Sequence, residues 1–91
     1  MSSDTSSSLV EGLREQITAC DVELIELVNR RLAIVTQLWS HKREHAQPLR
    51  SPEREAWLLQ HLQESNHGPL SEAGVRRLHE LILELTRDEL A

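Results

Sequence analysis

The strongest constraint on this chain is the stretch from Leu9 to Glu44, which contains no proline and only one glycine, Gly12. Proline and glycine are the residues that disfavour a helix most. Apolar residues recur through the stretch at intervals of three and four, the spacing of one helix face: Leu13, Ile17, Cys20, Leu24, Leu27, Ile34 and Leu38. A second set widens that face: Ile25, Val28, Leu32, Val35 and Trp39. The pattern predicts one long helix with Arg31 set within its apolar face.

Two shorter helices are predicted after it. Residues 45–50 form a connector, and Ser51-Pro52 is a typical N-cap followed by proline at the first helical position. The second helix is expected from Pro52 to about Glu64, with three leucines buried: Leu58, Leu59 and Leu62. Residues 66–69, Asn-His-Gly-Pro, end it.

Ser71 is the N-cap expected for the third helix. Its apolar residues are expected on one side: Val75, Leu78, Leu81, Ile82 and Leu85. Neither internal repeats nor strand-like alternation of polar and apolar residues occurs in the sequence.

The length of the first helix predicts an oligomer. A helix of about 36 residues is about 54 Å long, whereas a compact chain of 91 residues has a radius of gyration of about 12 Å. Two short helices cannot cover such a rod, so its apolar face is expected to pack on a second copy. The expected fold is all-α, with three helices in a two-fold homodimer over residues 9–91, after a disordered tail of residues 1–8. A coiled-coil adaptor would satisfy the same pattern.

Composition excludes several classes of partner. The net charge of −5 argues against nucleic acid. No apolar run approaches the roughly 20 residues of a membrane span. The polar, serine-rich start is unlike a signal peptide. Cys20 is the single cysteine, so no disulfide within the chain is possible, and a reducing cytoplasm is the expected location.

Two basic residues of the long helix are candidates for binding an anion. Arg31 interrupts the apolar face, where a charge is costly unless it is paired. Its partner could be a glutamate of the same helix or an acid of a second chain. Lys42, the only lysine, lies on the same face about 16 Å further on. Arg14 is about 42 Å from Lys42 along the helix, so it could join such a site only across a dimer.

Two further groups of side chains are typical of binding sites. Arg54 and Glu55 fall in the first turn of the second helix, where backbone N–H groups bind anions. His41 and His45 fit an H-x-x-E-H zinc pattern. Because no third ligand accompanies them, surface histidines near a helix end are the favoured interpretation.

Taken together, these motifs resemble the all-helical chorismate mutases. The resemblance rests on residues 13–17, Asp21, residues 24–31 and Lys42 in the first helix. Residues 48–55, Pro-Leu-Arg-Ser-Pro-Glu-Arg-Glu, resemble the start of that family's second helix, which usually carries aspartate where this chain has Ser51. Residues 66–71 resemble the connector before the third helix. The match covers about residues 9–90.

The resemblance implies an intertwined homodimer that rearranges chorismate to prephenate without a metal or cofactor. Arg31 would hold one substrate carboxylate, and Arg14 of the other chain would hold the second. Lys42 would donate to the ether oxygen and Glu55 would accept from the ring hydroxyl. The remaining positions implied to line the pocket are Ser51, Arg54, Thr86 and Glu89.

One position departs from the family pattern. Four residues beyond Thr86 the family usually carries glutamine or glutamate, which bonds the ether oxygen, whereas this chain has Leu90. Glu89 would replace it only if the helix end were distorted. The departure leaves three alternatives open: a weak mutase, a mutase completed by an activating partner enzyme, and an enzyme acting on isochorismate or an amino analogue such as amino-deoxychorismate. Two non-catalytic functions also remain: a module that binds chorismate or prephenate, and a plain dimerisation module.

Overall fold

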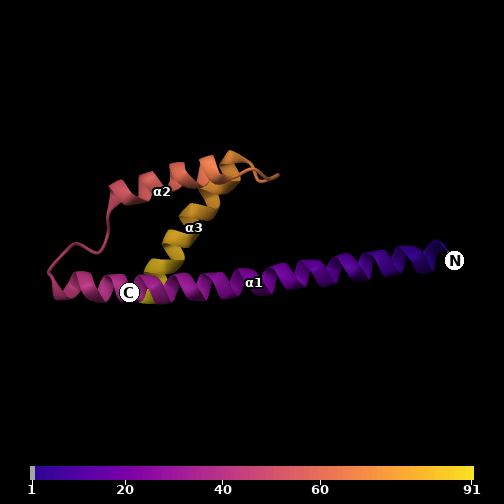
Figure 1. The fold of residues 1–91 in the computed structure, drawn as a ribbon, viewed down its shortest axis with the longest axis horizontal. Helices are drawn as coiled ribbons and strands as arrows, with labels where there is room; N and C mark the ends of the chain where they lie inside the picture. The colour runs from indigo at the N-terminus through magenta and orange to yellow at the C-terminus, as the bar shows by residue number, and fades with distance from the viewer. Residues whose placement is uncertain (1) are drawn as a thin grey trace. The chain divides into compact units, whose positions relative to one another are not determined.

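The computed structural model describes residues 2–91, with side chains from residue 6 onward, as three helices joined by two connectors (Figure 1). Helix α1 is Ser2–Glu44, α2 is Pro52–Ser65 and α3 is Glu72–Leu90. These described residues include no strand, and none of their helices is both long and apolar enough to cross a membrane. The predicted all-α class with one long and two shorter helices is therefore confirmed.

Helix α1 begins earlier than the sequence pattern indicates. It starts at Ser2 rather than at about Leu9, so it continues through residues expected to form a tail. Because this segment contains neither proline nor glycine, its backbone can extend the helix without strain. The division into a disordered tail and a helical domain stays a prediction.

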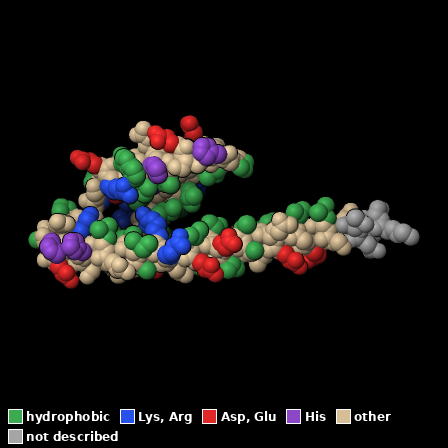
Figure 2. Space-filling view, viewed as in Figure 1, with side chains coloured by type: hydrophobic (Ala, Val, Ile, Leu, Met, Phe, Trp, Pro, Cys, Tyr) green, Lys and Arg blue, Asp and Glu red, His purple; other side chains and the backbone are tan. Residues whose placement is uncertain are grey.

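The apolar face of α1 is exposed in the single chain. Among its aliphatic residues, Ile17 is 60% exposed and Ile34 is 59% exposed. Figure 2 shows such hydrophobic side chains spaced along the helix. The chain divides into two compact units, residues 1–34 and 35–91. Within the first unit, most large apolar side chains keep about half of their surface in solvent, which is unusual for a soluble helix face.

Helices α2 and α3 pack against each other within the second unit. Ser51 caps α2, since its Oγ accepts from the backbone N of Arg54 at 3.3 Å. Ser71 caps α3 in the same way, with its Oγ 3.0 Å from the backbone N of Gly74. The predicted caps are confirmed, and α2 ends at Ser65, one residue beyond the expected Glu64.

The packed face of α3 differs from the predicted one. Its buried residues are Val75, His79 and Thr86, which succeed one another at intervals of four and seven on one helix face. Three leucines expected on the same side as Val75 are exposed: Leu78, Leu81 and Leu85. The packed face of α3 therefore carries two polar residues beside Val75, and these leucines are uncovered in the single chain. The leucines expected to be buried in α2 are half-buried.

A tight turn ends α1. The backbone N of Gln47 donates to the Lys42 carbonyl at 2.7 Å, and that of Ala46 donates to the Arg43 carbonyl at 3.2 Å. This pair of bonds is the Schellman arrangement, which places one residue in the left-handed region. That residue is Ala46, with φ of 53°, although glycine adopts this conformation at lower cost. The turn directs the chain back alongside the end of α1.

Candidate functional site

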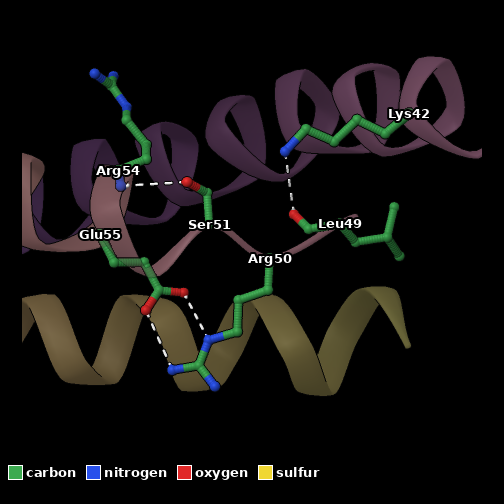
Figure 3. A network of polar contacts seen from close by, with 6 residues as sticks. All are labelled: Lys42, Leu49, Arg50, Ser51, Arg54 and Glu55. Atoms are coloured by element: carbon green, nitrogen blue, oxygen red, sulfur yellow. Dashed lines mark hydrogen bonds and ion pairs between the residues drawn. The ribbon is translucent and has the colours of Figure 1, made fainter. Parts of the chain in front are cut away.

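The turn after α1 brings Lys42 into contact with the connector that leads to α2. The ammonium nitrogen of Lys42 donates to the Leu49 carbonyl oxygen at 3.3 Å, and the lysine side chain is half-buried (Figure 3). Lys42 also belongs to the last turn of α1, where a positive charge interacts favourably with the helix dipole. The charged end of Lys42 is thus held close to the residues that begin α2.

Ser51, Arg54 and Glu55 form the first turn of α2. The Glu55 backbone N donates to the Ser51 carbonyl at 3.0 Å, while the Ser51 side chain caps Arg54. Ser51 and Glu55 are half-buried. Figure 3 shows Lys42 and these three residues in one polar network around the connector. The structure therefore brings together four of the residues expected to form the site.

The carboxylate of Glu55 is held by Arg50, a residue that sequence reasoning did not single out. Arg50 Nε donates to Glu55 Oε1 at 3.0 Å and Nη2 donates to Oε2 at 3.2 Å. The hydrogen bond to Glu55, and then the charge of Glu55, raise the pKa of Arg50. Arg50 immediately precedes the N-cap and Glu55 is the fourth residue of the helix, positions whose side chains commonly meet. This spacing could have identified Arg50 as a partner of Glu55 from the sequence.

The guanidinium of Arg54 lies over the Trp57 ring, 4.2 Å from its centroid. Trp57, which is 50% exposed, also stacks on His61 with centroids 4.9 Å apart. In Figure 3 the side chains of Arg54 and Glu55 leave α2 in opposite directions. Trp57 was not predicted to contact a site residue, although its spacing of three from Arg54 places the two on one helix face.

Arg14 and Arg31 lie in the first unit, residues 1–34. Arg14 is exposed, and its Nη1 is 3.5 Å from Glu11 Oε1 on the neighbouring turn. A surface pair of this kind holds its arginine weakly. Arg31 is half-buried, and this burial lowers the pKa of its guanidinium because it disfavours the charged form.

The last two predicted positions belong to α3. Thr86 is buried, and its Oγ1 donates to the Ile82 carbonyl at 2.7 Å. The helix stays regular to Leu90, because the backbone N of Ala91 donates to the Arg87 carbonyl at 3.0 Å. Leu90 is half-buried, as expected on the Thr86 side, whereas Glu89 is exposed. The helix end thus lacks the distortion that would move Glu89 onto the Thr86 face.

The two histidines of the zinc pattern interact with each other. Their rings stack with centroids 4.1 Å apart, and His45 Nδ1 is 2.8 Å from the His41 carbonyl oxygen. Among residues whose placement is described, no group of three or more His, Cys, Asp or Glu residues could hold a metal ion. The geometry of the pair fits a helix end better than a metal centre.

Comparison with known proteins decides the family. The protein family described as chorismate mutase type II matches this chain over residues 13–89. That range includes all eight predicted site residues. The chain belongs to this family. This family is named for an enzyme of the isomerase class. Leu90, the position that departs from the resemblance, lies just beyond the matched range.

Three relatives are similar in sequence to this chain. The T-protein of Haemophilus influenzae is 41% identical over 51 residues, which cover 56% of this chain and 14% of the relative. The bifunctional chorismate mutase/prephenate dehydratase of Pseudomonas aeruginosa is 33% identical over 79 residues, covering 81% of this chain and 22% of the relative. The protein of the same name from Stutzerimonas stutzeri is 35% identical over 81 residues, with the same coverage.

This chain therefore spans less than a quarter of the length of each of these relatives. No solved structure gives a significant match.

Proposed function

We propose that this chain is a chorismate mutase that rearranges chorismate to prephenate in aromatic amino-acid biosynthesis. The observation that carries the proposal is the family match over residues 13–89, within which Lys42 and Glu55 flank one connector. The relatives support it, since two of them are named as chorismate mutases joined to a prephenate dehydratase.

The proposed chemistry needs only charge and position. The rearrangement is intramolecular, so no cofactor or metal is required. Lys42 donates to the ether oxygen, where negative charge grows as the C–O bond breaks. Arg31 binds a substrate carboxylate through its planar fork, and Glu55 accepts a hydrogen bond from the ring hydroxyl. Such a site accelerates the reaction by holding the reactive conformer and by stabilising the developing charge.

The remaining residues are assigned supporting roles. Ser51 and Arg54 order the start of α2, and Thr86 provides a hydroxyl from α3. Leu90 offers no hydrogen bond, and the regular helix end keeps Glu89 off the Thr86 face, so an activating partner enzyme that contacts this helix end completes the site. The protein is proposed to act in the cytoplasm, without nucleic acid or membrane.

A homodimer is part of the proposal. Residues 13–38 of α1 present apolar side chains about half exposed in the single chain, and a second copy is the simplest cover for them. In that dimer, Arg14 of each chain binds the substrate held by the other chain. Its weak contact with Glu11 leaves the guanidinium available for this role.

The direct test is turnover by the purified protein. We expect chorismate to be consumed and prephenate to accumulate, with isochorismate and amino-deoxychorismate converted far more slowly. Conversion of one of these analogues in preference to chorismate would favour the related enzyme instead. Binding of chorismate without turnover would favour the regulatory module.

The shared site is tested by mixing two inactive variants. Arg14→Ala and Arg31→Ala should each lack activity as homodimers. A mixed dimer contains one site with both arginines intact, so mixing after subunit exchange should restore part of the activity. Exchanged heterodimers without any activity would argue against sites built from two chains, as would a folded monomer at 10.4 kDa in sedimentation.

A further inference from the structure

Arg50 holds the carboxylate of Glu55 through two parallel hydrogen bonds. The bonds are 3.0 Å and 3.2 Å long and use both carboxylate oxygens (Figure 3). A fork of this kind fixes the plane of a carboxylate as well as its position. A glutamate side chain that is otherwise free to rotate is thereby limited to few conformations.

The position of the pair indicates that orientation is its main effect. The Arg50 side chain is 65% exposed, whereas that of Glu55 is only 21% exposed. Ion pairs with such an exposed partner contribute little to folding, because water screens the charges. Arg50 thus approaches from the solvent side and restrains a more buried acid.

We infer that Arg50 is a positioning residue for Glu55, which it holds ready to accept a hydrogen bond from a substrate hydroxyl. This inference rests on the proposed function. Each carboxylate oxygen can accept two hydrogen bonds, so the fork leaves one acceptor site on each oxygen for a ligand. Arg54 does not serve the same purpose, because its guanidinium lies over Trp57.

The test is a double-mutant cycle on kcat and KM with chorismate, using Arg50→Ala, Glu55→Gln and both changes together. If Arg50 acts through Glu55, Arg50→Ala lowers kcat by about tenfold in the parent, the cost of a misplaced catalytic group. In the Glu55→Gln background the same change alters kcat by less than about twofold. Arg50→Lys keeps the charge without the fork, so its kcat should fall between the parent and Arg50→Ala.

Controls separate this role from a structural one. Arg76→Ala removes another exposed arginine and should leave kcat within about twofold. Circular dichroism and Tm should be unchanged in all of these variants. Equal losses of kcat in both backgrounds would overturn the inference, as would full activity of Arg50→Ala.

Equal increases of KM in both backgrounds would also overturn it, because they would show that Arg50 binds the substrate itself. A parent without turnover of chorismate would remove the proposed function and this role together. An active parent with additive losses would remove only the role of Arg50.

Discussion

The starts of α2 and α3 share one capping arrangement and differ in what surrounds it. Each helix has a serine N-cap whose Oγ accepts from the backbone N three residues later, at 3.3 Å for Ser51 and 3.0 Å for Ser71. Before the cap and at the fourth helical position, α2 carries the ion pair of Arg50 and Glu55. The same positions of α3 are occupied by Leu70 and Val75.

The start of α2 presents polar groups, whereas the start of α3 is packed. Val75 is only 5% exposed, and Leu70 lies so close to Gly74 that an added Cβ would be 2.5 Å from Leu70 Cδ1. At α2, by contrast, the charged groups of Arg50, Glu55 and Lys42 gather around the connector. The cap thus fixes where each helix begins, and its neighbours decide whether that start presents polar groups or builds the core.

Loss of the Lys42 ammonium should produce the largest effect, on activity alone. Lys42→Ala is expected to lower kcat/KM by about a hundredfold or more, because it removes a donor to the breaking ether bond. Lys42→Arg should retain part of the activity, since its charge survives. Steady-state kinetics on chorismate measure the loss, with helicity and Tm as controls. If the alanine variant turns over chorismate within about threefold of the parent, Lys42 is not a catalytic residue. The polar start of α2 would then lose its proposed link to catalysis.

Truncation in the core should affect stability alone. Val75→Ala removes two buried methyl groups beside the α3 start, and we expect a loss of about 2 kcal/mol in the free energy of unfolding. Urea denaturation at fixed protein concentration measures it. At a temperature where the variant is folded, kcat should remain close to that of the parent. A marked fall of kcat at that temperature would mean that the start of α3 also serves catalysis. The two helix starts would then no longer differ in function.

The two caps provide a matched pair. Ser51→Ala and Ser71→Ala each remove one side-chain acceptor, so each should cost about 1 kcal/mol of stability. Only Ser51→Ala should also lower kcat/KM, by at least about threefold, because Ser51 belongs to the proposed pocket. Denaturation and kinetics on the same preparations compare the two. Equal effects on activity would mean that both starts serve the site or that neither does.

The smallest effect is expected in the connector before α2. Ala46 has a φ of 53°, while no other described residue has a positive φ, including those before α3. Ala46→Gly should stabilise the protein by about 0.5 kcal/mol, because glycine adopts this conformation without strain. Ala33→Gly, within α1, should instead cost about 1 kcal/mol. A loss of stability in both variants would show that the turn does not favour glycine.

Sequence reasoning located the starts of α2 and α3 well because caps are local. Ser51 and Ser71 depend on a few neighbouring residues, and both occupy the predicted positions. The face of α3 was harder to predict, because apolar periodicity does not say which surface covers a residue. His79 and Thr86 are buried, while Leu78 is 48% exposed. The Thr86 hydroxyl tolerates burial because it bonds a carbonyl of its own helix.

The candidate site was predictable only in part. Lys42, Ser51 and Glu55 were recognisable because the family motif keeps their spacing. The contacts of Lys42 with the Leu49 carbonyl and of Glu55 with Arg50 depend on the path of the connector. That path follows from a left-handed alanine, a conformation that residue type does not indicate.

The bond between Lys42 and the Leu49 carbonyl has a consequence for how an anion would be exchanged. A backbone carbonyl is neutral, so it restrains the ammonium without cancelling its charge, as a carboxylate partner would. An ammonium has three N–H donors, so its bond to the Leu49 carbonyl leaves two of them for an arriving anion. In the proposed mutase, the carbonyl can therefore keep the lysine in place while its remaining donors bind and release the ligand.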